Sequence, residues 1–338
     1  MPILSNFLLR AEGGKASIFA TNIEHSMKIN LNCEITKEGS LCIPYDAIND
    51  VIKDMSGTIA LQAKGKSRLM VTYGLFSEME MVAQDPEQFP SPPAINGKEV
   101  EIGEDFITAL KTLDYAVDDD DAAVFSSICL DFQNETLQMA ATDRHQLVVK
   151  TNIVNASGVE GRYLLPGKAV KETLKTKPVK MILDDRYLSF EGPQATYVSR
   201  VIDGTYPDYA KVIPGESKIE ITIDKQQVLP AAKRVAAVLK RSNEPVVRLE
   251  ISDNKLKLRA ASDGVGKIKE EIPLESHTGG EIVVGVNGQY LLNTITGHPD
   301  PKITLGFIDP LNPIVTNGTN HIAIVLPIRL QDNGDKAA

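Results

Sequence analysis

Tryptophan is absent from this 338-residue sequence, aromatic residues make up only 5 %, and there are three cysteines. Because Cys33, Cys42 and Cys129 are odd in number and form no Cys-x-x-Cys motif, we interpret them as reduced thiols rather than as a disulfide framework. No apolar run is long enough to span a membrane, and the N-terminus lacks the basic region and the small-residue cleavage site of a secretory signal. We therefore expect a cytoplasmic protein that does not enter a membrane.

A net basic charge is also lacking. Aspartate and glutamate total 45 against 36 lysines and arginines, which gives a formal net charge of −9 and a pI of about 5.2. This balance argues against a surface coated for nucleic-acid binding. It is compatible with a basic patch on an acidic body, because local fields act independently of the total charge. The length itself predicts more than one domain.

An internal repeat organises the chain. Residues 6–21, 129–142 and 248–262 each contain an alternating apolar–polar run, a short polar turn and a second alternating run, which is the pattern of a β-hairpin. Each ends near a small-residue triplet that begins with Ala20, Ala141 or Ala261, so the spacings are 121 and 120 residues. A strand followed by a helix is predicted next in every repeat, at residues 41–55, 164–176 and 283–296.

The second and third repeats open with an additional strand and helix, at residues 100–117 and 219–241. Pro230 lies inside the latter and predicts either a kink or a helix that starts there. The first repeat has no such opening, and the repeat period places its expected start roughly 22 residues before Met1. We therefore expect the chain to be truncated at its N-terminus relative to its own repeat.

The repeat predicts three α+β domains of equivalent plan, with antiparallel strands and up to two helices each. We place them at residues 1–97, 98–217 and 218–330, followed by a polar tail at residues 331–338; the first domain lacks the opening strand and helix. Antiparallel sheets leave edges that proteins cover or close. Three equivalent domains joined edge to edge form an arc, which can close by head-to-tail pairing with a second copy.

Five stretches of the sequence resemble the bacterial beta sliding clamp family, the processivity subunit of the replicative DNA polymerase III holoenzyme. They are PILSNFLL, AATDRHQLVV, GTYPDYAKVIP, VNGQYLLNTI and VLPIRL, and the resemblance runs from Pro2 to Leu330. It implies the DNA-clamp fold, a head-to-tail homodimeric ring with sheets outside and helices lining a central hole. It also implies a non-catalytic function without cofactor or metal, in which the ring encircles duplex DNA of any sequence and tethers polymerases and other replication and repair proteins to it.

Basic side chains on two predicted helices suit a hole through which DNA passes. The second repeat carries Lys168, Lys171 and Lys175, and the third carries Lys233 and Arg234, then Lys240 and Arg241 seven residues on. Basic helix faces attract phosphates without reading sequence. The same spacing is typical of solvated helix faces, and the resemblance is what favours contact with DNA. Acidic residues on other helices, and the four-aspartate run at 118–121 that we place on a rim loop, do not fit this role.

The resemblance further implies a pocket between the second and third domains that receives linear peptides from polymerases and clamp-loader subunits. Two positions depart from the family, since Arg144 stands where glycine is usual and Gln146 where a basic residue is usual; we expect either to narrow or retune the pocket. Judged by residue type alone, Thr142 and Leu147 are equally compatible with ordinary packing at the end of a strand. Residues 326–330 are likewise compatible with a plain final strand. The assigned residues are Phe125, Thr142, His145, Leu147, Pro207, Lys211, Val212, Asn287, Tyr290, Leu311, Leu326, Pro327, Ile328 and Arg329.

The family correspondence also assigns Val238 and Leu239 to the dimer interface, where the third repeat meets the first repeat of a partner chain. Within one helix both residues are equally compatible with the core. Leu239 already belongs to an apolar stripe that includes Val228, Ala232 and Val235 at helical spacing.

Two alternative classes of protein stay open. An enzyme with an active site between domains would need a convergent set of titratable residues. The run Asp143, Arg144 and His145 suggests acid–base catalysis, but the sequence fixes no further group that would complete such a site. A turn-forming role suits Asp143 better. The five histidines have no spacing typical of metal ligands. The other alternative is a degenerate clamp relative that does not close a ring, which the missing opening helix keeps open.

Overall fold

The computed structural model describes residues 2–118 and 124–330. Residues 119–121 of the aspartate run and the predicted tail at 331–338 lie outside the described residues. The chain forms two compact units, residues 1–103 with 168–201 and residues 104–167 with 202–338. The second predicted domain therefore contributes to both units, and its predicted boundaries at 97/98 and 217/218 stay a prediction.

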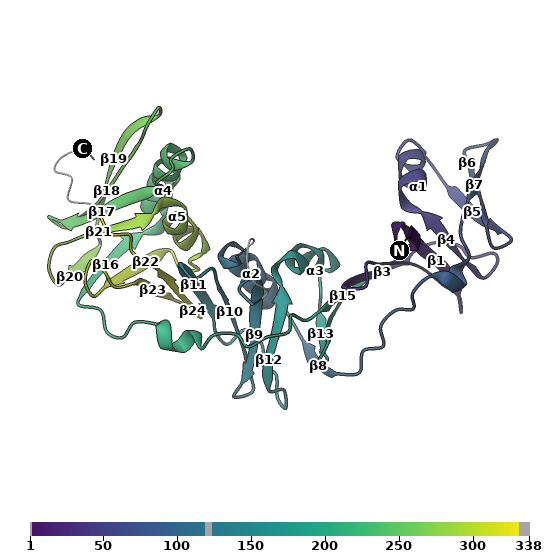
Figure 1. Cartoon of the computed structure of the whole chain (residues 1–338), viewed down its shortest axis with the longest axis horizontal. Helices are drawn as coiled ribbons and strands as arrows, with labels where there is room; N and C mark the ends of the chain where they lie inside the picture. Colours follow the sequence, from purple (N-terminus) through teal and green to yellow (C-terminus); the bar gives the residue numbers. More distant parts are fainter. Residues whose placement is uncertain (1, 119–123, 331–338) are drawn as a thin grey trace. The chain divides into compact units, whose positions relative to one another are not determined.

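The first unit is built on an eight-stranded antiparallel sheet with the order β4-β1-β2-β3-β15-β14-β13-β8 (Figure 1). Its centre joins β3 to β15, with Ser26 opposite Val198. This pairing makes one sheet from strands that belong to two different repeats. The strands are β1 (Asn6–Glu12), β2 (Lys15–Thr21), β3 (His25–Leu31), β4 (Gly39–Pro44), β8 (Lys98–Glu101), β13 (Lys180–Leu183), β14 (Tyr187–Glu191) and β15 (Ala195–Arg200).

A second, smaller sheet in this unit consists of β5 (Ile59–Lys64), β6 (Arg68–Tyr73) and β7 (Ser77–Val82). Helix α1 (Tyr45–Ile52) follows β4, and helix α3 (Val170–Thr176) packs on β14 and β15. Ile48 of α1 joins a core cluster with Leu69 and Val71. Ile48 is the buried residue of α1, whereas Ile52 remains 36 % exposed.

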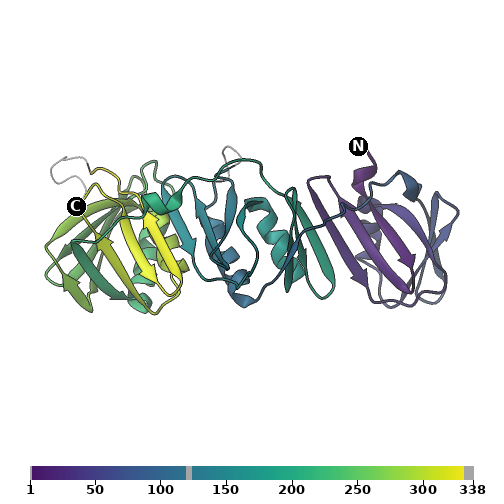
Figure 2. The same cartoon turned by 90° about the horizontal axis from the view of Figure 1, so that it is seen from below.

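The second unit contains a nine-stranded sheet with the order β12-β9-β10-β11-β24-β23-β22-β16-β20. Figure 2 shows the yellow strands β23 and β24 beside the blue-green strands β10 and β11. The strands are β9 (Ser127–Gln133), β10 (Thr136–Thr142), β11 (Gln146–Lys150), β12 (Gly161–Pro166), β16 (Ile219–Asp224), β20 (Ser276–Thr278), β22 (Lys302–Phe307), β23 (Ile314–Gly318) and β24 (His321–Val325).

A four-stranded sheet completes the second unit, with the order β19-β18-β17-β21. Its strands are β17 (Val246–Ser252), β18 (Lys255–Ser262), β19 (Gly266–Pro273) and β21 (Ile282–Asn287), and the helices of this unit are α2 (Glu104–Leu113), α4 (Lys225–Leu239) and α5 (Gly288–Gly297). Helices α4 and α5 pack against each other. The predicted stripe on α4 is confirmed as core, because Val228, Ala232, Val235 and Leu239 are at most 2 % exposed.

The predicted repeat is confirmed at the level of its elements. The hairpins β1–β2, β9–β10 and β17–β18 occupy the three predicted segments, and a strand leads into α1, α3 and α5 as expected. The helix start proposed at Pro230 is wrong, since α4 begins at Lys225 with Asp224 as its N-cap. The Asp224 side chain accepts a hydrogen bond from the backbone N–H of Gln226, which satisfies a donor at the helix start.

Basic side chains form a buried cluster at one end of the β11–β24 pair. Lys150 lies opposite His321 in the strand register, and the rings of His321 and His298 are 5.4 Å apart. Both histidines are 1 % exposed. Burial, followed by the nearby charges of Lys150 and His298, lowers the pKa of His321 to about 3, while Asp300 acts in the opposite direction and Lys225 adds to the lowering.

We predict that this cluster makes the second unit acid-sensitive. A base whose pKa is lower in the folded state loses stability as the pH falls below its unfolded value of about 6.5, so His321 costs about 2 kcal/mol of unfolding free energy by pH 5. His321→Leu removes this contribution and flattens the pH dependence, which urea unfolding between pH 7.5 and 5 measures. His277→Gln, on β20, is the control. Equal slopes for His321→Leu and the unmodified protein would contradict the prediction.

Candidate partner-binding site

One end of the nine-stranded sheet brings three of the predicted site segments together. Strand β10 ends at Thr142, β11 begins at Gln146 and β24 ends at Val325, which lies opposite both Gln146 and Ile314 in the strand register. The turn at 142–146, the segment after Val325 and the loop before Ile314 therefore leave the sheet at the same end.

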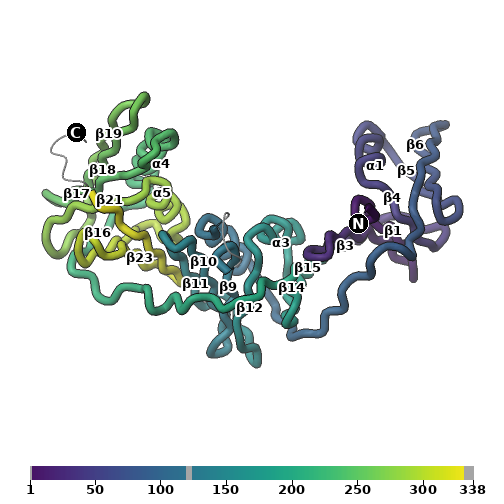
Figure 3. Tube along the Cα trace, in the orientation of Figure 1, coloured from purple at the N-terminus to yellow at the C-terminus, as the bar shows by residue number. Residues whose placement is uncertain are grey.

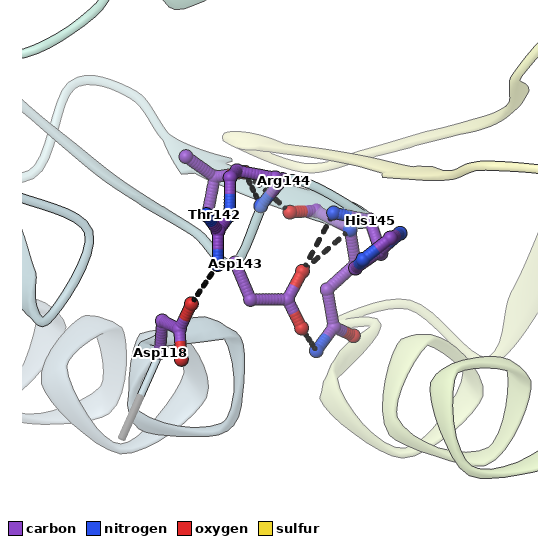
Figure 4. Close-up of polar contacts among 6 residues, drawn as sticks. Asp118, Thr142, Asp143, Arg144 and His145 are labelled. Carbon is purple, nitrogen blue, oxygen red and sulfur yellow. Dashed lines mark hydrogen bonds and ion pairs between the residues drawn. The ribbon is translucent and has the colours of Figure 1, made fainter. Parts of the chain in front are cut away.

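The turn between β10 and β11 is fixed by side-chain hydrogen bonds (Figure 4). The Thr142 hydroxyl donates to the carbonyl of Gln146 at 2.6 Å and accepts from the backbone N–H of Arg144 at 3.1 Å. The Asp143 carboxylate accepts from the backbone N–H groups of His145 and Gln146 at 2.9 and 2.8 Å. The predicted turn-forming role of Asp143 is confirmed.

Arg144 occupies a backbone conformation that favours glycine. Its φ is +75°, and the equivalent positions of the other repeats, Ile23 and Gly264, have φ values of +80° and +82°. All three repeats therefore make the same left-handed turn, and this explains why glycine suits the position.

The side chain of Arg144 lies against the start of β9. Its Nη2 atom is 2.8 Å from Oδ2 of Asp118, and its guanidinium carbon is 5.3 Å from the ring centre of Phe125. A guanidinium over an aromatic face is a favourable arrangement. Arg144 is thus held beside Phe125, one of the residues assigned to the pocket.

Gln146 and Leu147 point into the protein. Gln146 is 4 % exposed, and its Nε2 atom donates to the carbonyl of Tyr115 at 3.1 Å and to Asp143 at 2.9 Å. The Gln146 amide therefore braces the turn from inside rather than lining its surface, and the expected effect of Gln146 on the pocket stays a prediction. Leu147 is also 4 % exposed and belongs to a core cluster with Tyr206 and Ile324.

His145 and Tyr290 form an aromatic pair at this end of the sheet, with ring centres 6.3 Å apart and planes inclined by 20°. Tyr290 lies in the first turn of α5, where the Asn287 side chain caps the helix by accepting from the backbone N–H groups of Gln289 and Tyr290. Burial, with the neighbouring Asp143, raises the pKa of Tyr290 to about 12. Tyr290 therefore remains a neutral hydrogen-bonding group at physiological pH.

The segment after β24 is attached at two points. The backbone N–H of Leu326 donates to the carbonyl of His145 at 2.9 Å, and that of Ile328 donates to the carbonyl of Gly285 on β21 at 2.7 Å. A β-carbon at Gly285 would lie 2.6 Å from the Ile328 carbonyl oxygen, so this approach requires glycine. Residues 326–330 thus cross to the second sheet rather than extend the final strand.

The remaining predicted segments place apolar side chains at the surface. Val212 ends the 3₁₀ helix η5 (Tyr209–Val212), and Lys211 in the same turn pairs with Asp208 at 3.1 Å. Leu311 follows Asp309, whose carboxylate accepts its backbone N–H at 2.8 Å. Val212, Leu311 and Leu326 are 58, 61 and 39 % exposed, so each offers apolar area to a partner.

The predicted DNA-facing residues are distributed over both units, and all seven are exposed. In the first unit Lys168 pairs with Glu24 at 3.6 Å and Lys175 with Glu172 at 2.7 Å, near the exposed Lys171. In the second unit Glu270 on β19 holds Arg234 through two bonds of 2.7 and 2.8 Å. The charge of Arg234 is therefore compensated, unlike our expectation of an open basic face. Lys233, Lys240 and Arg241 lie on or just beyond the same helix.

The two residues assigned to the dimer interface differ in burial. Val238 is half-buried, whereas Leu239 is 2 % exposed and packs in the core of the second unit. Leu239 has almost no surface left for a partner, so the assignment of Leu239 is corrected to a core role. Within residues 2–118 and 124–330, no group of three or more potential ligands could hold a metal ion, and no described helix is long and apolar enough to cross a membrane.

Several residues of this site were not anticipated from the sequence. Tyr115 and Asp118 contact the turn from a segment about thirty positions earlier. Gly285 did carry a signal, because an isolated glycine inside a strand often marks a close backbone approach.

The repeated sheets and their paired helices define the fold class of the DNA clamps. Sequence profiles of the DNA polymerase III beta subunit match the chain in order, the N-terminal domain at residues 1–93, the central domain at 103–208 and the C-terminal domain at 210–328. The chain therefore belongs to the DNA polymerase III beta subunit family, and the predicted family and fold are confirmed.

Individual relatives agree with this assignment. The beta sliding clamp of Staphylococcus aureus is 22 % identical over 352 residues, which cover 97 % of this chain and 92 % of that protein, and the Staphylococcus epidermidis clamp is also 22 % identical with the same coverage. Among solved structures, the sliding clamp of Bacillus subtilis superposes with a TM-score of 0.90 at 19 % identity, covering 98 % of this chain and 93 % of that one. A ligand-bound clamp of Pseudomonas aeruginosa gives 0.88 at 24 % identity with the same coverage.

Proposed function

We propose that this protein is a DNA sliding clamp, a non-catalytic ring that encircles duplex DNA in the cytoplasm and tethers polymerases to it. The observation that carries the proposal is the match of all three beta-subunit domains, in order, to residues 1–328. The alternative of an enzyme has no support in the site, where Asp143 and Gln146 are occupied in bracing a turn.

Attraction to DNA in this proposal comes from the exposed lysines and arginines of α3 and α4. Such contacts bind phosphates in a salt-dependent manner and carry no sequence information. Lys171, Lys233, Lys240 and Arg241 are the strongest contributors, because Arg234 and Lys175 already have carboxylate partners within 3 Å.

We predict that replacing Lys171, Lys233, Lys240 and Arg241 with glutamine weakens DNA association. The slope of log affinity against log salt becomes shallower by about 0.9 for each phosphate that the protein no longer neutralises. Titration of a labelled duplex at several salt concentrations measures both the affinity and this slope. Lys15→Gln, Lys28→Gln, Lys37→Gln and Lys64→Gln, at exposed positions on strands or loops of the first unit, form a charge-matched control. Strong dependence of binding on base sequence would contradict the proposal.

Ring closure is proposed to occur between β7 of one copy and β19 of a second copy, because each of these strands lies at an edge of its sheet. Exposed glutamates alternate along β7 at Glu78 and Glu80, and exposed lysines along β19 at Lys267 and Lys269. Glu80 already pairs with Arg68 and Lys269 with Glu271, so the proposed attraction relies on Glu78 and Lys267. Opposite charges on facing strands favour pairing, and an unpaired edge is a template for a second chain. Helix α4, which carries Val238, packs against β19.

We predict that Val238→Lys shifts the protein toward monomer while it stays folded, because pairing would bury an uncompensated charge. Native mass measurement distinguishes a 36.8 kDa chain from a species of twice that mass. Ala237→Lys, at the exposed neighbouring position, is the matched control and leaves the dimer intact. A dimeric, folded Val238→Lys protein would exclude Val238 from the interface.

Partners are proposed to bind the exposed apolar side chains at the end of the nine-stranded sheet through a linear peptide. Val212, Leu311 and Leu326 supply apolar contacts, while His145, Tyr290 and Arg329 supply polar ones. Grooves for peptides combine a few apolar anchor positions with polar groups in this way. The Pseudomonas aeruginosa clamp solved with griselimycin suggests that compound as a second probe.

We predict that Leu326→Ala weakens binding of a synthetic peptide copied from the clamp-binding segment of a replicative polymerase by about 1–2 kcal/mol, the cost of losing part of an aliphatic contact. Isothermal calorimetry measures the change. Leu75→Ala, at an 89 % exposed position of the first unit, is the matched control and has no effect. Unchanged affinity in Leu326→Ala would remove residues 326–329 from the site.

A further inference from the structure

A carboxylate is buried near one edge of the nine-stranded sheet, on the second strand from that edge. Asp131 lies on β9 between Leu130 and Phe132 and is 4 % exposed. Arg162 stands directly opposite on β12, with Nε and Nη2 both 2.9 Å from Oδ2 of Asp131. A buried carboxylate is costly unless it is paired and hydrogen-bonded, so this arrangement has to be held in place.

A third donor, in addition to the two nitrogens of Arg162, reaches the same oxygen from outside the sheet. The hydroxyl of Tyr209, the first residue of η5, donates to Oδ2 of Asp131 at 2.9 Å. The guanidinium carbon of Arg162 lies 5.6 Å from the centre of the Tyr209 ring. Burial raises the pKa of the Tyr209 hydroxyl, so it remains a protonated donor.

The segment that carries Tyr209 covers one face of the sheet (Figure 3). Tyr206 and Tyr209 pack with Cys129, Ala140 and Leu164 in one buried cluster. Cys129 and Asp131 share this face because side chains alternate along a strand. The Tyr206 hydroxyl lies 3.5 Å from the Ala140 carbonyl, a longer contact than that of Tyr209.

Tyr209 is therefore the polar attachment that directly precedes the exposed residues of the proposed peptide site, and Ile213, which follows them, packs against the same buried cluster. Lys211 and Val212 follow it within the same short turn, whose backbone bonds run from Lys211 to Asp208 at 3.2 Å and from Ile213 to Ala210 at 3.4 Å. Both bonds are local, so they fix the shape of the turn and not its place over the sheet.

We propose that Asp131, Arg162 and Tyr209 are positioning residues that hold the Lys211–Val212 wall of the peptide site against the sheet. The inference rests on the proposed function of this site. It extends that function to the buried Asp131 and Tyr209 and to Arg162, whose side chain is partly exposed, and it assigns none of them a contact with the peptide. The three residues act as one unit, because each supplies a contact to the other two.

Tyr209→Phe tests the proposal, because it removes the hydroxyl and keeps the ring. We expect the affinity for the polymerase-derived peptide to fall about tenfold, the lower end of the effect of losing one buried hydrogen bond to a charged group. Hydrogen exchange of the backbone amides at residues 206–213 becomes faster in the same variant. Tyr197→Phe is the matched control, since its hydroxyl makes a 2.9 Å contact with His25 in the first unit, and it changes neither measurement.

Arg162→Lys provides a second variant that keeps the charge but loses the planar fork and its stacking on Tyr209. We expect a smaller loss of affinity than in Tyr209→Phe, with faster exchange in the same residues. If the unmodified protein binds no peptide, the proposed peptide site itself fails. If the unmodified protein binds and Tyr209→Phe retains its affinity and its exchange rates, the positioning role is overturned.

Discussion

The structure depends on antiparallel pairing between strands that belong to different repeats. β3 pairs with β15 in the first unit, and β11 pairs with β24 in the second. Each repeat alone would expose a strand edge with unpaired backbone groups, which is a liability for aggregation. Pairing across repeats satisfies these groups and merges two half-sheets into one. It also explains why the compact units do not coincide with the repeats, since the second repeat gives strands to both.

The β11–β24 pair determines where the candidate site forms. Its register places Gln146 opposite Val325 at one end and Lys150 opposite His321 at the other. The first end collects the turn at 142–146 and the segment that carries Leu326, so the proposed partner site lies where strands of two repeats end together. The other end buries two histidines and Lys150. The same five-residue pair therefore connects the proposed partner site with the predicted sensitivity to acid.

Local pattern was sufficient to predict the repeat, its hairpins and its helices, because side-chain periodicity reports which face of an element is buried. It was not sufficient for contacts made between distant segments. Asp131 meets Arg162 and Tyr209 across 31 and 78 residues, and nothing in the spacing marks the three as partners. Correspondence with the family located the turn at Thr142 and the segment at Leu326, but it assigned Leu239 to a dimer interface, whereas this chain buries that residue. Burial depends on what packs opposite each residue, which only the folded chain reveals.

The central claim is that the protein holds DNA by encircling it, and topological retention tests this most directly. The protein is loaded onto a nicked circular plasmid by its clamp loader and ATP, then washed at a salt concentration that screens phosphate contacts. The account predicts that it stays on the circle and leaves when a restriction enzyme linearises the plasmid. Equal loss from circular and linear DNA at high salt would contradict it, because the protein would then be held by charge alone.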